Sequence, residues 1–109
     1  MDEENQRILE LQAEMLSVLA NPKRLMILNL LNDQEKTVGE IASELEISIQ
    51  NTSQHLRSMK DRGIVVSRKE GQTVYYKLTN PIFHDCCQLV RRAMVEELNK
   101  RESLFDVTK

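Results

Sequence analysis

The spacing of apolar and polar residues predicts two helices in the first third of the chain. Residues 3–20 carry apolar side chains at intervals of three and four, the period of a helix with one apolar side, at Ile8, Leu11, Met15, Leu16 and Leu19. Asn21 and Pro22 then give a second helix an N-cap and a proline at its first position. A polar loop, residues 32–36, follows it. The side chains of the second helix expected to face a core are Leu25, Ile27, Leu28 and Leu31.

Two further helices follow, joined by a short turn. Thr37 and Glu40 fit a capping box at the start of the third helix. Residues 46–47 make the turn, Ser48 caps the fourth helix, and Gly63 ends it. The apolar or buried sides are expected to hold Val38, Ile41, Ala42 and Leu45 in the third helix and Ile49, Thr52, Leu56 and Met59 in the fourth.

The period of the pattern changes after residue 63. Residues 64–69 and 73–78 are rich in β-branched and aromatic side chains, which predicts a β-hairpin of two short strands. Helical spacing returns over residues 82–101, whereas residues 102–109 show no clear period and predict an irregular, fraying tail. The predicted order is α-α-α-α-β-β-α. The apolar positions of the last helix are Ile82, Cys86, Leu89, Val90, Ala93, Met94 and Leu98.

The fourth helix opens with polar side chains where a core helix would carry leucine or alanine. Two helices joined by a short turn, the second with polar and basic residues at its start, form a helix-turn-helix. Such amides and hydroxyls can hydrogen-bond base edges in the major groove, and the N–H groups at the helix start can hold a phosphate. A polar-fronted helix is also typical of a solvated surface, but the turn, the glycine stop and the basic hairpin together favour DNA binding.

Charge is unevenly distributed along the chain, whose net charge is −2. Residues 1–47 hold ten acidic and four basic side chains, whereas residues 48–78 hold six basic and two acidic, and residues 79–109 hold five of each. The positive charge therefore coincides with the fourth helix and the hairpin, as in a surface that binds a polyanion. The candidate DNA contacts are Ser48, Gln50, Asn51, Ser53, Gln54, His55, Arg57, Arg68, Lys69 and Gln72.

Length and composition exclude several classes of protein. A chain of 109 residues forms one domain, and no apolar run approaches the roughly 18 residues of a membrane span. The acidic start, MDEENQRILELQ, lacks the order of a secretory signal, so we expect a cytoplasmic protein without a membrane partner. Two adjacent cysteines are no disulfide framework, which agrees with a reducing compartment. With two histidines, no Ser/His/Asp arrangement and no glycine-rich phosphate loop, the chain is not expected to be an enzyme.

Residues from about 15 to 80 resemble the ArsR-type family of winged helix-turn-helix regulators. The stretch LANPKRLMILNLL is similar to the family's Leu-Ala-(Asp/Asn)-Pro-x-Arg-Leu-x-Ile-Leu-x-Leu-Leu pattern. The family's Ser-x-His-Leu core stands here at residues 53–56, and its wing matches residues 68–72 followed by 74–78. The resemblance implies a winged helix-turn-helix fold, mainly α with a small β-hairpin.

The resemblance also implies a homodimer formed by the first and last helices. It divides the chain into a first dimerisation helix, a helix-turn-helix with its wing, a second dimerisation helix and a tail, at residues 1–20, 21–80, 81–101 and 102–109. The apolar stripes of the two outer helices exceed what a small core can cover, although part of each could pack on its own subunit. A dimer can bind two half-sites about 34–36 Å apart at once.

Many members of this family release DNA when an effector, most often a metal, binds. The metal site on the third helix requires a Cys-x-Cys cluster, which residues 37–42 lack. The positions that correspond to the site on the last helix are Asn80, Ile82, Ala93 and Glu96. One potential ligand in four does not make a zinc site, which requires three or four donors. We therefore expect no metal cofactor at either familiar site.

Three residues near the start of the last helix remain as sensor candidates. His84, Cys86 and Cys87 could form a thiol sensor or an unfamiliar metal site assembled across the dimer. The alternative, which we favour, is that Cys86 is a small core residue and Cys87 a bystander.

The sequence therefore predicts a DNA-binding transcriptional regulator. It is expected to be a homodimeric repressor that binds a palindromic operator and leaves the DNA when an unidentified effector binds to it. The alternative is a winged helix used only for protein–protein contact. His55 is expected to make a hydrogen bond to DNA or to another helix. Of Tyr75 and Tyr76, which alternate across the second strand, one is expected to pack on the core and the other to brace the wing or touch the DNA backbone.

Overall fold

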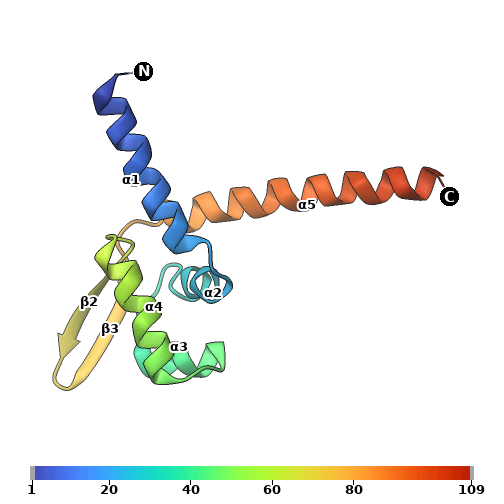
Figure 1. Ribbon diagram of the computed structural model, residues 1–109. Helices are drawn as coiled ribbons and strands as arrows, with labels where there is room; N and C mark the ends of the chain where they lie inside the picture. The colour runs from blue at the N-terminus through green and yellow to red at the C-terminus, as the bar shows by residue number, and fades with distance from the viewer. Residues whose placement is uncertain (1, 109) are drawn as a thin grey trace.

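The computed structural model describes residues 2–108, and side chains for residues 2–102. Helices α2, α3 and α4 form a compact group beside the β2–β3 hairpin, and α1 and α5 extend away from it in different directions (Figure 1). This is the predicted winged helix-turn-helix. The elements are α1 (Glu3–Leu19), α2 (Pro22–Leu30), β1 (Lys36–Thr37), α3 (Val38–Leu45), α4 (Ile49–Asp61), β2 (Val65–Glu70), β3 (Thr73–Leu78) and α5 (Ile82–Thr108).

The predicted helix caps are confirmed. The Asn21 side chain accepts hydrogen bonds from the backbone N–H groups of Lys23 and Arg24 at the start of α2. The Thr37 hydroxyl accepts from the Glu40 N–H at 3.1 Å, and the Glu40 carboxylate accepts from the Thr37 N–H at 2.9 Å, which completes the capping box of α3. The hydrogen bond from the Thr37 backbone, more than any other cause, lowers the pKa of Glu40.

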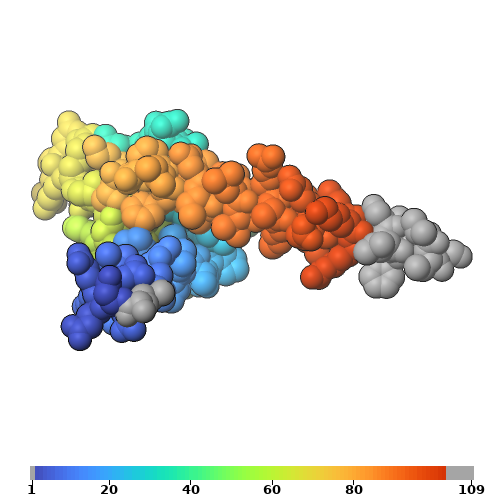
Figure 2. Space-filling model, turned by 90° about the horizontal axis from the view of Figure 1, so that it is seen from above, coloured from blue at the N-terminus to red at the C-terminus, as the bar shows by residue number. Residues whose placement is uncertain are grey.

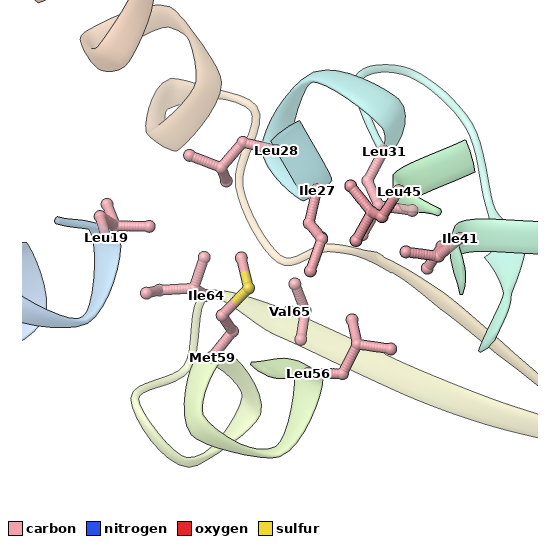
Figure 3. Close-up of a cluster of buried hydrophobic side chains, with 10 residues drawn as sticks. All are labelled: Leu19, Ile27, Leu28, Leu31, Ile41, Leu45, Leu56, Met59, Ile64 and Val65. Atoms are coloured by element: carbon pink, nitrogen blue, oxygen red, sulfur yellow. The ribbon is translucent and has the colours of Figure 1, made fainter. Parts of the chain in front are cut away.

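A single apolar core joins the first four helices to the start of the hairpin (Figure 3). Two inward positions expected from periodicity are wrong, because Leu25 is 39% exposed and Ile49 is 58% exposed. The one buried polar side chain recorded among the described residues is Thr52, whose hydroxyl donates to the Ser48 carbonyl at 2.9 Å. The core side chains are Leu19, Ile27, Leu28, Leu31, Ile41, Leu45, Leu56, Met59, Ile64 and Val65.

The sheet has a third strand that the sequence pattern does not predict. Strand β1 pairs antiparallel with β3, with Lys36 opposite Tyr76 and Thr37 opposite Tyr75, and the strand order is β1-β3-β2. Two residues are too few to show the alternation by which a strand is recognised. The pairing ties the wing to the start of α3.

Helix α5 is longer than predicted. It continues to Thr108, so the expectation of an irregular tail after residue 101 is wrong. The helix projects well beyond the rest of the molecule (Figure 2). Within residues 2–108, no helix combines the length and apolar character that crossing a membrane requires. The exposed large apolar residues of α5 are Ile82, Leu89, Val90, Met94, Val95 and Leu98.

Two substitutions on α4 test the packing that orients this helix. Leu56→Ala empties a fully buried position and is expected to lower the free energy of unfolding by about 2–5 kcal/mol. Ile49→Ala removes the same class of side chain from an exposed position and is expected to change it by less than about 0.5 kcal/mol. Urea denaturation at matched protein concentration measures both values. Equal losses would contradict the orientation of α4 described here.

Candidate nucleic-acid interface

The turn between α3 and α4 spans three residues. Glu46 adopts the left-handed conformation, with φ of 56°, and caps α3 through hydrogen bonds from its N–H to the carbonyls of Ala42 and Ser43. Ile47 packs against the core. The Ser48 hydroxyl accepts from the Asn51 N–H at 3.0 Å and starts α4. These contacts fix the angle at which α4 leaves α3.

The buried side of α4 determines which side chains face outward. Each residue advances by about 100° around a helix, so Gln50, Gln54 and Arg57 lie opposite the buried Thr52 and Leu56. All three are exposed. The outward side of α4 therefore presents two amides and a guanidinium along successive turns.

The remaining predicted contacts in the first turns of α4 are less available. Ser48 and Asn51 are exposed, but the Ser48 oxygen already serves as the helix cap. Ser53 is half-buried. The structure thus shows a capping role for Ser48 and partial burial for Ser53, whereas Asn51 stays exposed near the start of α4.

His55 makes the interhelical hydrogen bond that was one of its two expected roles. Its Nδ1 accepts from Nε of Arg24, on α2, at 3.1 Å. The ring is half-buried, and burial lowers its pKa, with further lowering by the nearby charges of Arg24 and Lys23. Sequence reasoning did not assign a role to Arg24. The sequence feature that could have indicated a role for Arg24 is its place in the first turn of a helix, where the helix dipole disfavours positive charge.

The wing holds its arginine between two carboxylates. Nε of Arg68 donates to Glu35 at 2.7 Å, and Nη1 donates to Glu70 at 2.8 Å. These two hydrogen bonds raise the pKa of Arg68 above its ordinary value. The guanidinium also lies over the Tyr75 ring, 4.4 Å from its centroid. Tyr75 therefore braces the wing, whereas Tyr76 packs against the core.

Lys69 and Gln72 are exposed at the tip of the wing. Gly71, between the strands, has a φ of 62°, a conformation that glycine adopts without strain. Because the two strands pair directly on either side of this turn, with Glu70 opposite Thr73, the register places Lys69 and Gln72 at the tip of the hairpin.

The positive charge of residues 48–78 is partly neutralised within the chain. Arg62 forms an ion pair with Glu14 of α1 at 2.7 Å, and Lys60 donates to the neutral Ser67 hydroxyl at 2.8 Å. Among the described residues, Arg57, Lys69 and Lys77 have no recorded carboxylate partner. Of these, Arg57 lies on the outward side of α4 and Lys69 at the tip of the wing, where a phosphate can reach them.

The two cysteines have the reverse of their favoured roles. Cys86 is exposed and Cys87 is half-buried against the core, so the expectation that Cys86 is the core residue is wrong. Burial raises the pKa of Cys87, and the neighbouring Cys86 adds to the effect. A raised pKa leaves less reactive thiolate at neutral pH.

His84 lies two residues before Cys86 on the same helix, and its side chain is mostly buried. Its Nε2 faces the Gln88 amide at 3.3 Å, and Gln88 in turn donates to Asn29 of α2 at 3.0 Å. Among the side chains of residues 2–102, no three His, Cys, Asp or Glu groups of this one chain gather as a metal site would require.

Comparison with known proteins agrees with this geometry. The model of the bacterial regulatory protein arsR family matches residues 21–67. The transcriptional activator HlyU of Vibrio cholerae is 42% identical over 78 residues, which cover 72% of each chain. A solution structure of the homodimeric winged helix-turn-helix DNA-binding domain of a possible ArsR-family regulator from Mycobacterium bovis has a TM-score of 0.81 at 29% identity, covering 92% of this chain and 93% of that one. NolR from Sinorhizobium fredii has a TM-score of 0.70 at 33% identity, covering 88% and 92%.

The chain belongs to the arsR family of bacterial regulatory proteins. It is a winged helix-turn-helix transcriptional regulator and not an enzyme. The relatives do not favour the alternative of a winged helix used only for protein contact.

Proposed function

We propose that the chain acts in the cytoplasm as a homodimer that recognises a palindromic operator through α4 and represses transcription until an effector releases it. The observation that carries this proposal is the outward side of α4, where Gln50, Gln54 and Arg57 stand opposite a fully buried side. Glutamine amides can donate to and accept from adenine in the major groove, and arginine pairs with guanine or with phosphate.

The wing and the start of α4 supply contacts to the DNA backbone. Lys69 is exposed at the wing and carries a charge without a recorded carboxylate partner among the described residues. Gln72 and Asn51 can donate to phosphate oxygens, as can N–H groups at the start of α4. Arg68 joins them only when a phosphate replaces Glu35 or Glu70 as its partner. These contacts give affinity and register, whereas the glutamines give sequence preference.

The dimer follows from apolar surface that one subunit leaves uncovered. Leu89 and Val90 of α5 are each 63% exposed, and Ile8 and Leu16 of α1 are 55% and 50% exposed. Large contiguous apolar patches on a soluble protein mark interaction surfaces. A second copy supplies the matching surface and the second recognition helix.

The relatives include both an activator and a repressor of transcription. HlyU of Vibrio cholerae is a transcriptional activator, whereas SdpR of Bacillus subtilis, 33% identical over 67 residues, is a transcriptional repressor. Repression needs only that the bound dimer cover a promoter. No metal cofactor is proposed, because residues 37–42 hold no cysteine and the positions of the last-helix site hold Asn80, Ile82 and Ala93 beside a single carboxylate, Glu96.

Gln54→Ala tests base reading. It is expected to weaken binding to an operator selected from random duplexes by about 1–3 kcal/mol, with little effect on unrelated duplex, because it removes hydrogen bonds to a base edge. Lys69→Gln is the matched contrast, expected to weaken both duplexes alike and to reduce the slope of log affinity against log salt by about 0.9. Fluorescence anisotropy titrations at several salt concentrations measure both. Equal losses on the two duplexes for Gln54→Ala would show that it reads no base.

Glu35→Gln tests whether the chain's own carboxylates compete with DNA for Arg68. Removing the Glu35 charge makes the guanidinium easier to transfer to a phosphate, so affinity for any duplex is expected to rise by about two- to fivefold, the scale of an exposed ion pair. Glu96→Gln makes the same charge change on α5, where the carboxylate pairs with Arg92, and is expected to have a smaller effect. Identical gains from both variants would mean that only net charge matters.

Leu89→Glu tests the dimer. A charge placed in the apolar side of α5 is expected to raise the dimer dissociation constant at least about tenfold, which corresponds to roughly 1.4 kcal/mol. Asn99→Glu adds the same charge at an exposed polar position of α5 and serves as the control. Sedimentation velocity over a range of protein concentrations measures the association. An unchanged dimer in Leu89→Glu would remove α5 from the interface.

A further inference from the structure

The first turn of α2 carries two consecutive cations that bind other elements of the fold. Nζ of Lys23 donates to the carbonyl of Leu45, the last residue of α3, at 3.2 Å. Nη1 of Arg24 donates to the carbonyl of Val18, in the last turn of α1, at 3.0 Å. The negative ends of two helix dipoles therefore compensate for cations that the dipole of α2 itself disfavours.

The Val18 carbonyl has a specific need for this donor. In a continuing helix its partner would be the N–H four residues later, but that residue is Pro22, which has none. The Arg24 side chain supplies the missing hydrogen-bond donor to the Val18 carbonyl. The same guanidinium reaches His55 through Nε at 3.1 Å, so one residue joins the end of α1 to the middle of α4.

The bond to His55 sets the chemical state of the ring. An arginine Nε–H can only donate, so Nδ1 of His55 must be the unprotonated acceptor and any ring proton must be on Nε2. Protonating Nδ1 would turn the acceptor into a donor and set two cations against each other. The contact therefore exists only with a neutral imidazole.

We propose that Arg24 is a positioning residue that, through neutral His55, sets the orientation of the recognition helix α4 relative to the dimerisation helix α1. The inference rests on the proposed function, because it gives α1 and α4 the roles proposed above. In a homodimer, this orientation determines the distance and angle between the two copies of α4. Loss of the contact therefore weakens binding to two correctly spaced half-sites more than binding to one.

The charges around His55 give the contact a pH dependence of known sign. Arg24 and Lys23 of α2 act on the ring, and burial and both cations lower the pKa of His55. Two recorded contacts join charged groups at the end of α4 to other elements. Arg62, the C-cap residue of α4, pairs with Glu14 of α1, and Lys60 donates to Ser67 of β2. Both contacts lie at the C-terminal end of α4, beyond His55. The pKa of His55 in the folded protein therefore lies below its ordinary value of about 6.5. The stabilisation that the neutral ring gives the folded state is complete above about pH 6.5 and is lost as the pH falls through the folded-state pKa.

This sign separates positioning from direct contact with DNA. If His55 donated to a phosphate, its protonation would strengthen binding at acid pH. If His55 holds Arg24, protonation breaks the contact and weakens operator binding. His55→Gln supplies a neutral acceptor that does not titrate, and Arg24→Lys keeps the charge but lacks the planar fork that reaches both Val18 and His55. His84→Gln changes the only other histidine of the chain and is the matched control.

The experiment measures affinity for the wild-type-selected operator, for one half-site and for an operator with one base pair inserted between half-sites, at fixed salt from pH 7.5 to 5.5. For wild type and His84→Gln, operator affinity is expected to fall as the pH decreases, by less than about tenfold at pH 5.5, because a pKa below its ordinary value leaves part of His55 neutral there. His55→Gln is expected to bind like wild type at pH 7.5 and to show no fall. Arg24→Lys is expected to bind the operator weakly throughout and to distinguish the two spacings less.

Other outcomes overturn the inference in distinguishable ways. Wild-type affinity that rises at acid pH, or a fall that persists in His55→Gln, overturns it while leaving the proposed function intact. Should Arg24→Lys fail to fold, His55→Gln and its control still decide the question. A wild-type protein that selects no duplex overturns the proposed function, and this inference with it.

Discussion

The packing of one side of α4 into the core is the constraint on which the recognition surface depends. Leu56 and Met59 are fully buried, and the Thr52 hydroxyl bonds within the helix, so α4 cannot rotate without emptying the centre of the domain. The opposite side is therefore fixed, and its amides project at the spacing of successive helical turns. A rotation of about one residue, roughly 100°, would exchange Gln54 for half-buried His55 on the outward face.

A second constraint is that the chain satisfies much of its own positive charge. Glu14 pairs with Arg62, and Glu35 with Glu70 holds Arg68, so the basic segment in the sequence is not equally basic as a surface. The cations of α2 likewise bind helix ends rather than solvent. On the proposed function, Arg68 exchanges its carboxylate partners for phosphate when DNA binds, so acidic residues outside α4 affect the affinity for DNA.

Periodicity predicted the helices, the hairpin and the caps because these features are local. It misplaced Leu25 and Ile49, since a single apolar residue at the edge of a helical stripe does not reveal whether a neighbour covers it. The roles of Cys86 and Cys87 were reversed for the same reason. The Arg24–His55 bond joins residues 31 positions apart, and no pattern within one helix could indicate it. Contacts with DNA remain predictions, supported by exposure and by family.

On the proposed function, two copies of α4 enter neighbouring major grooves on one side of a duplex. Hydroxyl-radical footprinting of the wild-type protein on its selected operator tests this most directly. We predict two symmetric protected regions, separated by about one helical turn or a multiple of it, on one face of the DNA. A single protected region, or uniform protection without a two-fold centre, would contradict it.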